Sequence, residues 1–237
     1  MSVIFGKWMN TLPTIAAVGA VGGLLTVIGG FWYWATPKFW EVGYMPTQPG
    51  GGFNHQIHAG QLGMDCRYCH TNVESANEAN IPPVSVCYGC HAENHVAHTE
   101  TQTQKTEFIR TAYAADQPIP WRRVHKLPDY VRNFPHSVHV NAGVSCFSCH
   151  GQMDALPVVS QRESLSMGWC LDCHRATTNA PETVLVPRER VTDLVWVAEH
   201  MQTVQRGAEG AVPGFSARAV FDQLRMTPPE NCGACHY

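Results

Sequence analysis

The feature that most constrains this chain is the placement of its cysteines. All ten belong to pentapeptides of the form Cys-x-x-Cys-His. In chain order, the first to fifth motifs occupy residues 66–70, 87–91, 146–150, 170–174 and 232–236. So many cysteines in a chain of 237 residues would usually indicate a disulfide framework. Here every cysteine belongs to one of the motifs, so none is left over to form a disulfide. The spacing indicates a chemistry in which two thiols act together with the histidine that follows them.

Cys-x-x-Cys-His is the attachment motif of c-type haem. The two thiols add across the haem vinyl groups, and the short tether places the adjacent histidine under the iron as its proximal ligand. We therefore expect five covalently bound haem c groups. The expected attachment residues are Cys66, Cys69, Cys87, Cys90, Cys146, Cys149, Cys170, Cys173, Cys232 and Cys235. The expected proximal ligands are His70, His91, His150, His174 and His236.

A zinc protein is the alternative interpretation, since structural zinc sites are also built from Cys-x-x-Cys pairs. Zinc does not require a histidine after every pair, whereas all five pairs in this chain have one. The regularity favours haem.

A low-spin haem iron also needs a sixth ligand, usually a second histidine or a methionine. Eight of the thirteen histidines lie outside the motifs. The strongest candidates are the pairs His55 with His58 and His136 with His139, because residues three apart on a helical turn share a face. The alternative is that each pair is two incidental histidines on a surface helix. Against this, the pattern Phe-x-His-x-x-His occurs twice, each time followed by two haem motifs. The remaining candidates are His200, Met153, Met167 and Met226, while His95 and His98 are also open to a surface role.

The recurrence of that pattern is an internal repeat. Each copy consists of Phe-x-His-x-x-His, beginning at Phe53 or Phe134, followed by two haem motifs, and the fifth motif stands apart near the C-terminus. We therefore expect four segments. They are an N-terminal transmembrane anchor at residues 1–37, a linker at 38–52, a first dihaem module and connection at 53–133, and a second dihaem module with the fifth haem at 134–237.

The N-terminal segment has the composition of a membrane-spanning helix. Residues 8–37 contain no charge, and residues 15–34 are almost continuously apolar, enough to cross the ~30 Å hydrocarbon layer. A cleaved signal sequence would have a shorter apolar stretch and a cleavage site between small residues, which is not evident. We expect a single-pass anchor in a bacterial inner (cytoplasmic) membrane. Because c-type haems are attached on the outer side, the haem domain is expected on the periplasmic side.

The rest of the chain predicts a mostly α and irregular fold. Helical spacing of apolar residues appears at 190–204, a second helix is expected at 106–115, and strand signals are nearly absent. With five haems in 237 residues, haem faces would replace much of the side-chain core, so short helices and long loops are expected. The net charge of −3 gives no basic footprint for nucleic acid.

One part of the sequence resembles a known family. Residues 119–131, with the segments 134–139, 146–150 and 165–175 that follow, are similar to the pentahaem cytochrome c subunit of alternative complex III, a quinol oxidoreductase unrelated to the cytochrome bc1 complex. The resemblance extends over nearly the whole chain and is most specific at 119–175. The haem modules also resemble class III cytochromes c, in which Phe-x-His-x-x-His supplies distal ligands.

The resemblance implies a fifth distal ligand and a set of partners. It implies that His125 ligates a haem iron. It also implies association with other subunits of a membrane complex. These are an outer subunit with iron–sulfur clusters and a molybdopterin-oxidoreductase-like fold, polytopic quinol-oxidising subunits, and a monohaem cytochrome c.

Three functions are open to a chain with an apolar anchor and five haem motifs. The first is a non-catalytic electron-transfer subunit of a membrane quinol:electron-acceptor oxidoreductase complex, which the resemblance and the anchor favour. The second, a multihaem enzyme converting nitrite or hydroxylamine, needs an open coordination position, and the chain has at least as many candidate distal histidines as haems. The third is a membrane-anchored multihaem quinol dehydrogenase feeding a periplasmic reductase. Such proteins usually carry four haems, and Glu41 is the one evident acid near the end of the apolar segment.

Overall fold

The structure, a computed structural model, describes most of the chain in two units. The described residues are 6–35, 52–93, 95–96, 99–121, 124–125, 127, 131, 134–206, 212–224 and 227–236. The two units are Met1–Tyr44 and Met45–Tyr237. The predicted linker at 38–52 lies outside the described residues except for Gly52.

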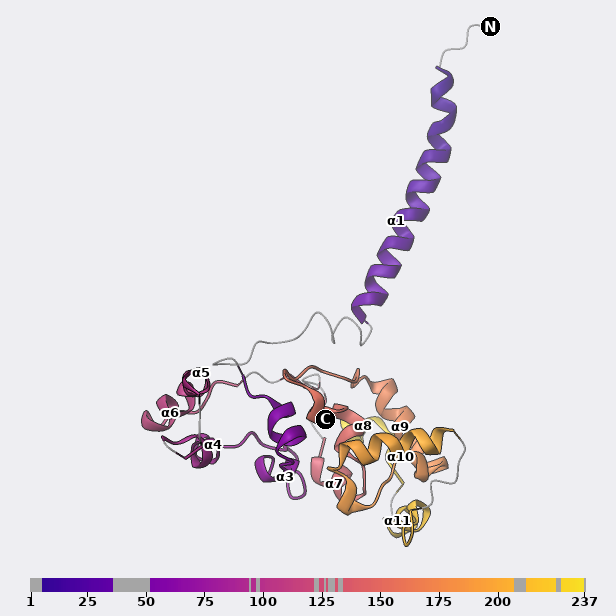
Figure 1. The fold of residues 1–237 in the computed structure, drawn as a ribbon. Helices are drawn as coiled ribbons and strands as arrows, with labels where there is room; N and C mark the ends of the chain where they lie inside the picture. The colour runs from indigo at the N-terminus through magenta and orange to yellow at the C-terminus, as the bar shows by residue number, and fades with distance from the viewer. Residues whose placement is uncertain are drawn as a thin grey trace, which may run out of the picture. The chain divides into compact units, whose positions relative to one another are not determined.

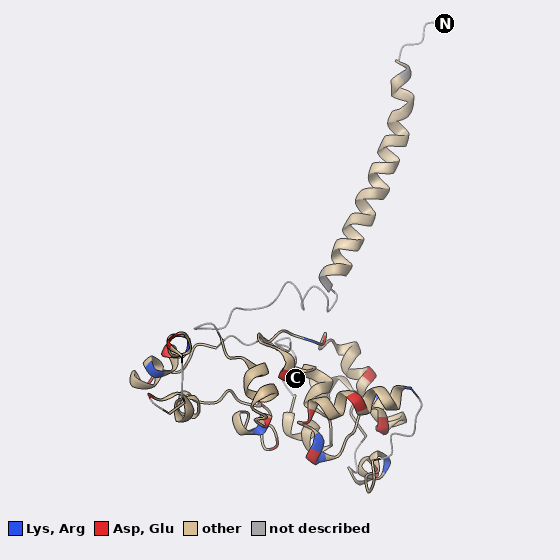
Figure 2. Ribbon diagram, viewed as in Figure 1, with Lys and Arg blue, Asp and Glu red and all other residues tan. Residues whose placement is uncertain are grey.

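The first unit is a single long helix. A short 3-10 turn, η1 (Lys7–Thr11), leads into α1 (Leu12–Ala35), which carries no charged residue, as Figure 2 shows. Its apolar side chains are exposed rather than packed, with Val27 69% and Trp32 71% accessible. Trp8–Tyr33 is long and apolar enough to span a membrane, the only such helix among the described residues, and signal sequences share these properties.

The second unit is helical and irregular, as predicted (Figure 1). Its longer elements are α4 (Val84–His91), α5 (Glu100–Lys105), α6 (Glu107–Ala114), α7 (His136–Asn141), α9 (Met167–Asn179), α10 (Leu194–Gln205) and α11 (Ala217–Gln223). The short ones are η3 (Gln56–Gln61), α3 (Cys66–Cys69), α8 (Cys146–His150), η4 (Met153–Ala155), η5 (Pro181–Thr183), η6 (Arg188–Arg190) and α12 (Cys232–Cys235). Across the described ranges the only β pairing is an isolated bridge between Val144 and Leu185.

The residue before a haem motif often starts the motif's helix. Asp65, Ser145 and Asn231 are the N-caps of α3, α8 and α12, and their side chains accept hydrogen bonds from backbone N–H groups of the first turn. Such caps satisfy donors that a helix leaves unpaired at its start. The caps fix where these three motifs become helical, so both cysteines of each motif lie on one short helical turn.

The side-chain core of the second unit is small. One cluster consists of Val73, Val140, Val186, Val191 and Val197, and another of Val184, Leu185 and Ala217. Gly143 lies where the two meet, at φ +93°, and a Cβ there would collide with the carbonyl of Val186. The predicted helices at 190–204 and 106–115 are confirmed as α10 and α6, which pack on α8 and α4 respectively.

Candidate haem-binding sites

The two Phe-x-His-x-x-His segments have nearly the same internal geometry. In the first, the Phe53 ring meets His55 edge-on at 4.7 Å between ring centroids and stacks on His58 at 4.3 Å. In the second, the Phe134 ring meets His136 edge-on at 5.0 Å and stacks on His139 at 4.6 Å. The backbone differs, since His55 precedes the π-helical η3 whereas His136 begins the α-helical α7. The shared ring arrangement shows that the phenylalanine orients both imidazoles.

The second histidine of each segment faces the histidine of a haem motif. The ring centroids of His58 and His91, of the second motif, are 6.0 Å apart. Those of His139 and His174, of the fourth motif, are 6.4 Å apart. Two imidazoles bound to opposite sides of one metal ion, at about 2.0 Å per metal–nitrogen bond, have centroids roughly 6.3 Å apart. Both pairs therefore have the spacing that suits one iron between them.

The first histidine of each segment lies near the other motif of its repeat. Burial and the nearby His70 and His58 lower the pKa of His55 to about 4. Burial also lowers the pKa of His150 to about 3, with further contributions from His125, His136, His70 and His55. His55 is thus close to the histidine of the first motif, and His136 to that of the third.

Backbone carbonyls fix the tautomer of many of these histidines. The carbonyl oxygens of Asn54, Asn80, Asn77, Pro135 and Pro229 lie 2.6–2.9 Å from the Nδ1 atoms of His58, His70, His136, His139 and His174 respectively. Because a carbonyl oxygen only accepts, each Nδ1 carries a proton and donates, and in the neutral imidazole the Nε2 atom then has a lone pair. This second hydrogen bond is the usual way that a metal-ligating histidine is oriented.

Two further histidines have buried nitrogen atoms without a hydrogen-bond partner, Nδ1 of His55 and Nε2 of His125. Burial lowers the pKa of His125 to about 4. A buried, neutral imidazole nitrogen without a partner is costly unless a ligand completes it. The orphaned atoms and the lone pairs described above are a donor set that fits haem iron.

His125 takes a different position from the paired histidines. Its ring centroid lies 4.3 Å from that of His150, with the planes 66° apart. This separation is too short for a metal ion between the rings. His125 and His136 thus both approach the histidine of the third motif.

The fifth motif is held against the fourth. His236 follows α12, with its backbone N–H bonded to the carbonyl of Cys232. The segment just before this helix contacts α9, because the Pro229 carbonyl accepts from His174 Nδ1 and Glu230 pairs with Arg175 at 3.0 Å. The contacts place the two motifs next to each other.

The motif cysteines are mostly half-buried, and two of them touch. The thiol of Cys66 lies against that of Cys146, and this contact raises the pKa of Cys66 and lowers that of Cys146. Burial raises the pKa of Cys149 to about 12. Cys66 and Cys149 are therefore neutral thiols, the form that adds to a vinyl group with its own proton. In the described part of the chain, no group of three or more His, Cys, Asp or Glu side chains is arranged to hold a metal ion directly.

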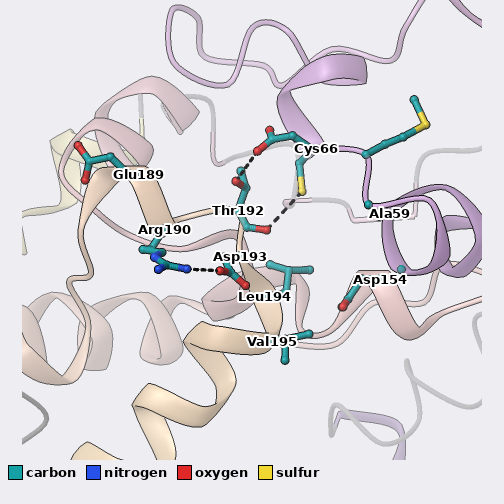
Figure 3. A pocket seen from close by; sticks show the side chains of 13 residues that line it. Ala59, Cys66, Asp154, Glu189, Arg190, Thr192, Asp193, Leu194 and Val195 are labelled. Atoms are coloured by element: carbon teal, nitrogen blue, oxygen red, sulfur yellow. Dashed lines mark hydrogen bonds and ion pairs between the residues drawn. The ribbon is translucent and has the colours of Figure 1, made fainter. Parts of the chain in front are cut away.

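A cavity of about 440 Å³ opens beside Cys66 (Figure 3). Asp154 lines it, with one carboxylate oxygen buried and unpaired, as do Thr192 and Asp193. Thr192 donates to Asp65 at 2.8 Å, and its carbonyl lies 4.0 Å from the Cys66 thiol. The cavity provides space next to one attachment thiol of the first motif.

The remaining candidate ligands lie apart from these pairs or outside the described residues. Nδ1 of the exposed His95 donates to the Gly89 carbonyl at 2.9 Å, and His200 stacks on Trp196 at 4.8 Å between ring centroids. Met153 is half-buried in η4, and Met167 is 67% exposed. His98 and Met226 lie outside the described residues.

Sequence reasoning did not find the carbonyl acceptors or the segment that joins the motifs. Backbone carbonyls such as those of Asn80 and Pro229 carry no residue-type signal, since every residue has one. Val191 and Thr192 bind the starts of two motif helices, yet nothing in their residue types marks them.

The helical fold, the five motifs and the paired imidazoles are those of a multihaem c-type cytochrome. A curated relative is a protein of the same class. The chain is 27% identical over 135 residues to the multiheme cytochrome c subunit of menaquinone reductase from Nitratidesulfovibrio vulgaris (strain Hildenborough). The match spans 57% of this chain and 59% of that protein. No family model matches the chain.

Proposed function

We propose that this chain is an electron-transfer subunit of a membrane quinol:electron-acceptor oxidoreductase complex like alternative complex III, with five covalently bound haem c groups. The proximal ligands are the five motif histidines. The distal ligands are His55 for the first motif, His58 for the second, His136 for the third and His139 for the fourth. His125 is the fifth distal ligand.

The observation that carries this proposal is the spacing of the two imidazole pairs. His58 with His91 and His139 with His174 have the separation of two axial ligands of one metal ion. Haem c bound at these sites supplies an iron that accepts and releases one electron. The chain's own contribution is to hold His58, His139 and His174, through Nδ1–H and a backbone carbonyl, with the Nε2 lone pair available.

Two histidines per iron leave no coordination position for a substrate. An electron-transfer role therefore suits the site better than catalysis on a small molecule, which needs an open position. Ligation by two histidines also keeps the coordination shell the same in both oxidation states, so little has to rearrange when an electron passes.

The apolar helix and the relative support attachment to a quinone-linked membrane complex. α1 is long enough to anchor the chain in a bacterial inner membrane, with the haem unit on the periplasmic side. The relative is named as a subunit of a menaquinone reductase. Proposed partners are an iron–sulfur and molybdopterin-like outer subunit, polytopic quinol-handling subunits and a monohaem cytochrome c.

Purification of the tagged chain from its own membranes tests the proposal. We expect other subunits to copurify and quinol oxidation to require them. If the isolated chain alone oxidises a quinol, the chain is instead a membrane-anchored multihaem quinol dehydrogenase. An isolated chain with no haem and no copurifying membrane subunit would contradict both functions.

A further inference from the structure

The first and third motifs form hydrogen bonds with two consecutive residues, Val191 and Thr192. The carbonyl of Val191 accepts from the backbone N–H of Cys146 at 3.1 Å and from the Ser145 hydroxyl at 2.7 Å. At the next residue, Thr192 bonds to Asp65, the cap of the first motif's helix, and its carbonyl approaches the Cys66 thiol. Because the thiols of Cys66 and Cys146 also touch, the first and third motifs begin side by side.

The second motif adjoins the first through the turn that carries His55 and His58. The Phe53 ring contacts both imidazoles, while His58 faces His91 of the second motif. His55 lies near His70 of the first motif. One short turn therefore carries histidines that lie next to the histidines of both motifs, and it would hold the two haems close together.

The same construction joins the third motif to the fourth. Phe134 contacts both His136 and His139, and His139 faces His174 of the fourth motif. The fifth motif is then fastened to the fourth by the bonds from His174 to the Pro229 carbonyl and from Arg175 to Glu230. Each neighbour relationship thus rests on a separate set of contacts.

The motif cysteines differ in how exposed their side chains are. Cys90 of the second motif and Cys232 of the fifth are exposed, whereas the other eight motif cysteines are half-buried. A haem at an exposed motif is within reach of a partner protein, and a haem at a buried one exchanges electrons with its neighbours.

We propose that the five haem sites form one unbranched series in the order second, first, third, fourth, fifth, and that partner proteins exchange electrons with the chain at the second and fifth sites. This inference rests on the proposed function. The spatial order differs from the sequence order because the first motif, not the second, joins the two repeats. Each transfer moves one electron from a reduced site to its oxidised neighbour. The donor and acceptor are the other redox subunits of the complex.

The iron positions in the haem-loaded full-length chain test the order directly. In an electron cryomicroscopy or crystal structure of the complex, we expect the third-motif iron to be nearer to the first-motif iron than to that of the second. We expect the fifth-motif iron to have that of the fourth as its nearest neighbour. Five haems with either relationship reversed would overturn the order and leave the proposed function standing. Fewer than four haems would overturn the proposed function itself.

A redox titration tests the same order in solution with variants that stay haem-loaded. Replacing a distal histidine by methionine raises the potential of its haem, which then stays reduced. A reduced neighbour carries one positive charge less, so adjacent haems become harder to reduce. His58 belongs to the second site, at one end of the series, so His58→Met should raise the midpoint potential of one haem and lower that of one other. His55 belongs to the first site, which has a neighbour on each side, so His55→Met should raise the midpoint potential of one haem and lower those of two others. The reverse counts would overturn the order.

Discussion

The imidazole ring of His139 lies 6.4 Å from that of His174, with the ring planes 29° apart, although 35 residues separate them in the sequence. Each ring is held by its own carbonyl, His139 by Pro135 at 2.8 Å and His174 by Pro229 at 2.6 Å. In the neutral imidazoles both Nδ1 atoms therefore carry the proton, and both Nε2 atoms have a lone pair. The two rings therefore have the spacing and orientation to bind one iron between them. The carbonyl groups that hold them come from different parts of the chain.

Replacing one member of this pair should change one haem. In His139→Ala we expect the haem of the fourth motif to lose its sixth ligand, become high-spin and bind carbon monoxide when reduced, because His139 is the histidine whose ring faces that of His174 at the spacing of two ligands of one iron. Electron paramagnetic resonance and visible spectra of the purified chain measure this. The other four haems should stay low-spin. Five unaltered low-spin haems would contradict the pairing.

His95 provides a matched control for that substitution. Its Nδ1 has the same kind of bond, to the Gly89 carbonyl at 2.9 Å, but its side chain is exposed. His95→Ala should leave all haem spectra unchanged. A high-spin haem in this control would show that a backbone-bonded histidine outside the two repeats also ligates iron.

The haem content follows from the motifs alone. A pyridine haemochrome assay on denatured protein should give five haems c per chain, and they should resist extraction by acidified acetone because thioether bonds hold them. This prediction is based on the five Cys-x-x-Cys-His pentapeptides. Fewer than four haems per chain would refute the central assignment. Replacing both cysteines of one motif should lower the content by one, which calibrates the assay.

Much of this architecture was predictable because it depends on residue type. The motifs, the recurring Phe-x-His-x-x-His pattern and the uncharged apolar segment are all side-chain signals, and the helices at 106–115 and 190–204 follow from apolar spacing. The structure adds that Phe53 and Phe134 contact both histidines of their segments in matching orientations. The recurrence of the phenylalanine was visible in the sequence, but its contacts were not.

The junctions between motifs could not be predicted for a physical reason. Val191, Thr192 and Pro229 act through backbone groups, which all residues share, and their partners lie far away in sequence. The pairing of distal with proximal histidines depends on those junctions. A sequence pattern therefore supplies the set of ligands, whereas the long-range contacts decide which ligands meet.

The small side-chain core allows a stability test with an internal control. Val197 in α10 is fully buried in the first hydrophobic cluster, while Val195, two residues earlier, is 52% exposed. Val197→Ala should lower the free energy of unfolding by about 2 kcal/mol through lost packing. Val195→Ala should change it by less than about 0.5 kcal/mol. Thermal unfolding of the haem-loaded chain measures both. Equal effects would show that this cluster does not form.

The role of α1 is tested by removing it. Deleting residues 1–37 and supplying a cleavable signal sequence should give a haem-loaded protein that no longer stays with the membrane fraction, because the spanning segment is gone. Membrane fractionation and haem staining measure this, with the full-length chain as control. A truncated form that still copurifies quantitatively with the membrane complex would show that the haem unit provides most of the attachment.

His125 is the distal ligand whose partner the contacts leave most open, and its substitution is the most informative. Its buried Nε2 has no hydrogen-bond partner, and its ring lies 4.3 Å from that of His150. His136 also approaches His150, and we propose His125 as the fifth distal ligand because its buried Nε2 has no other partner. His125→Ala should therefore leave four haems low-spin and turn one high-spin and reactive towards carbon monoxide. His200→Ala, in which a histidine stacked on Trp196 is removed, is the control and should change no spin state. If a methionine takes the fifth position instead, one haem of the unmodified protein should have a raised midpoint potential, and His125→Ala should leave every haem low-spin.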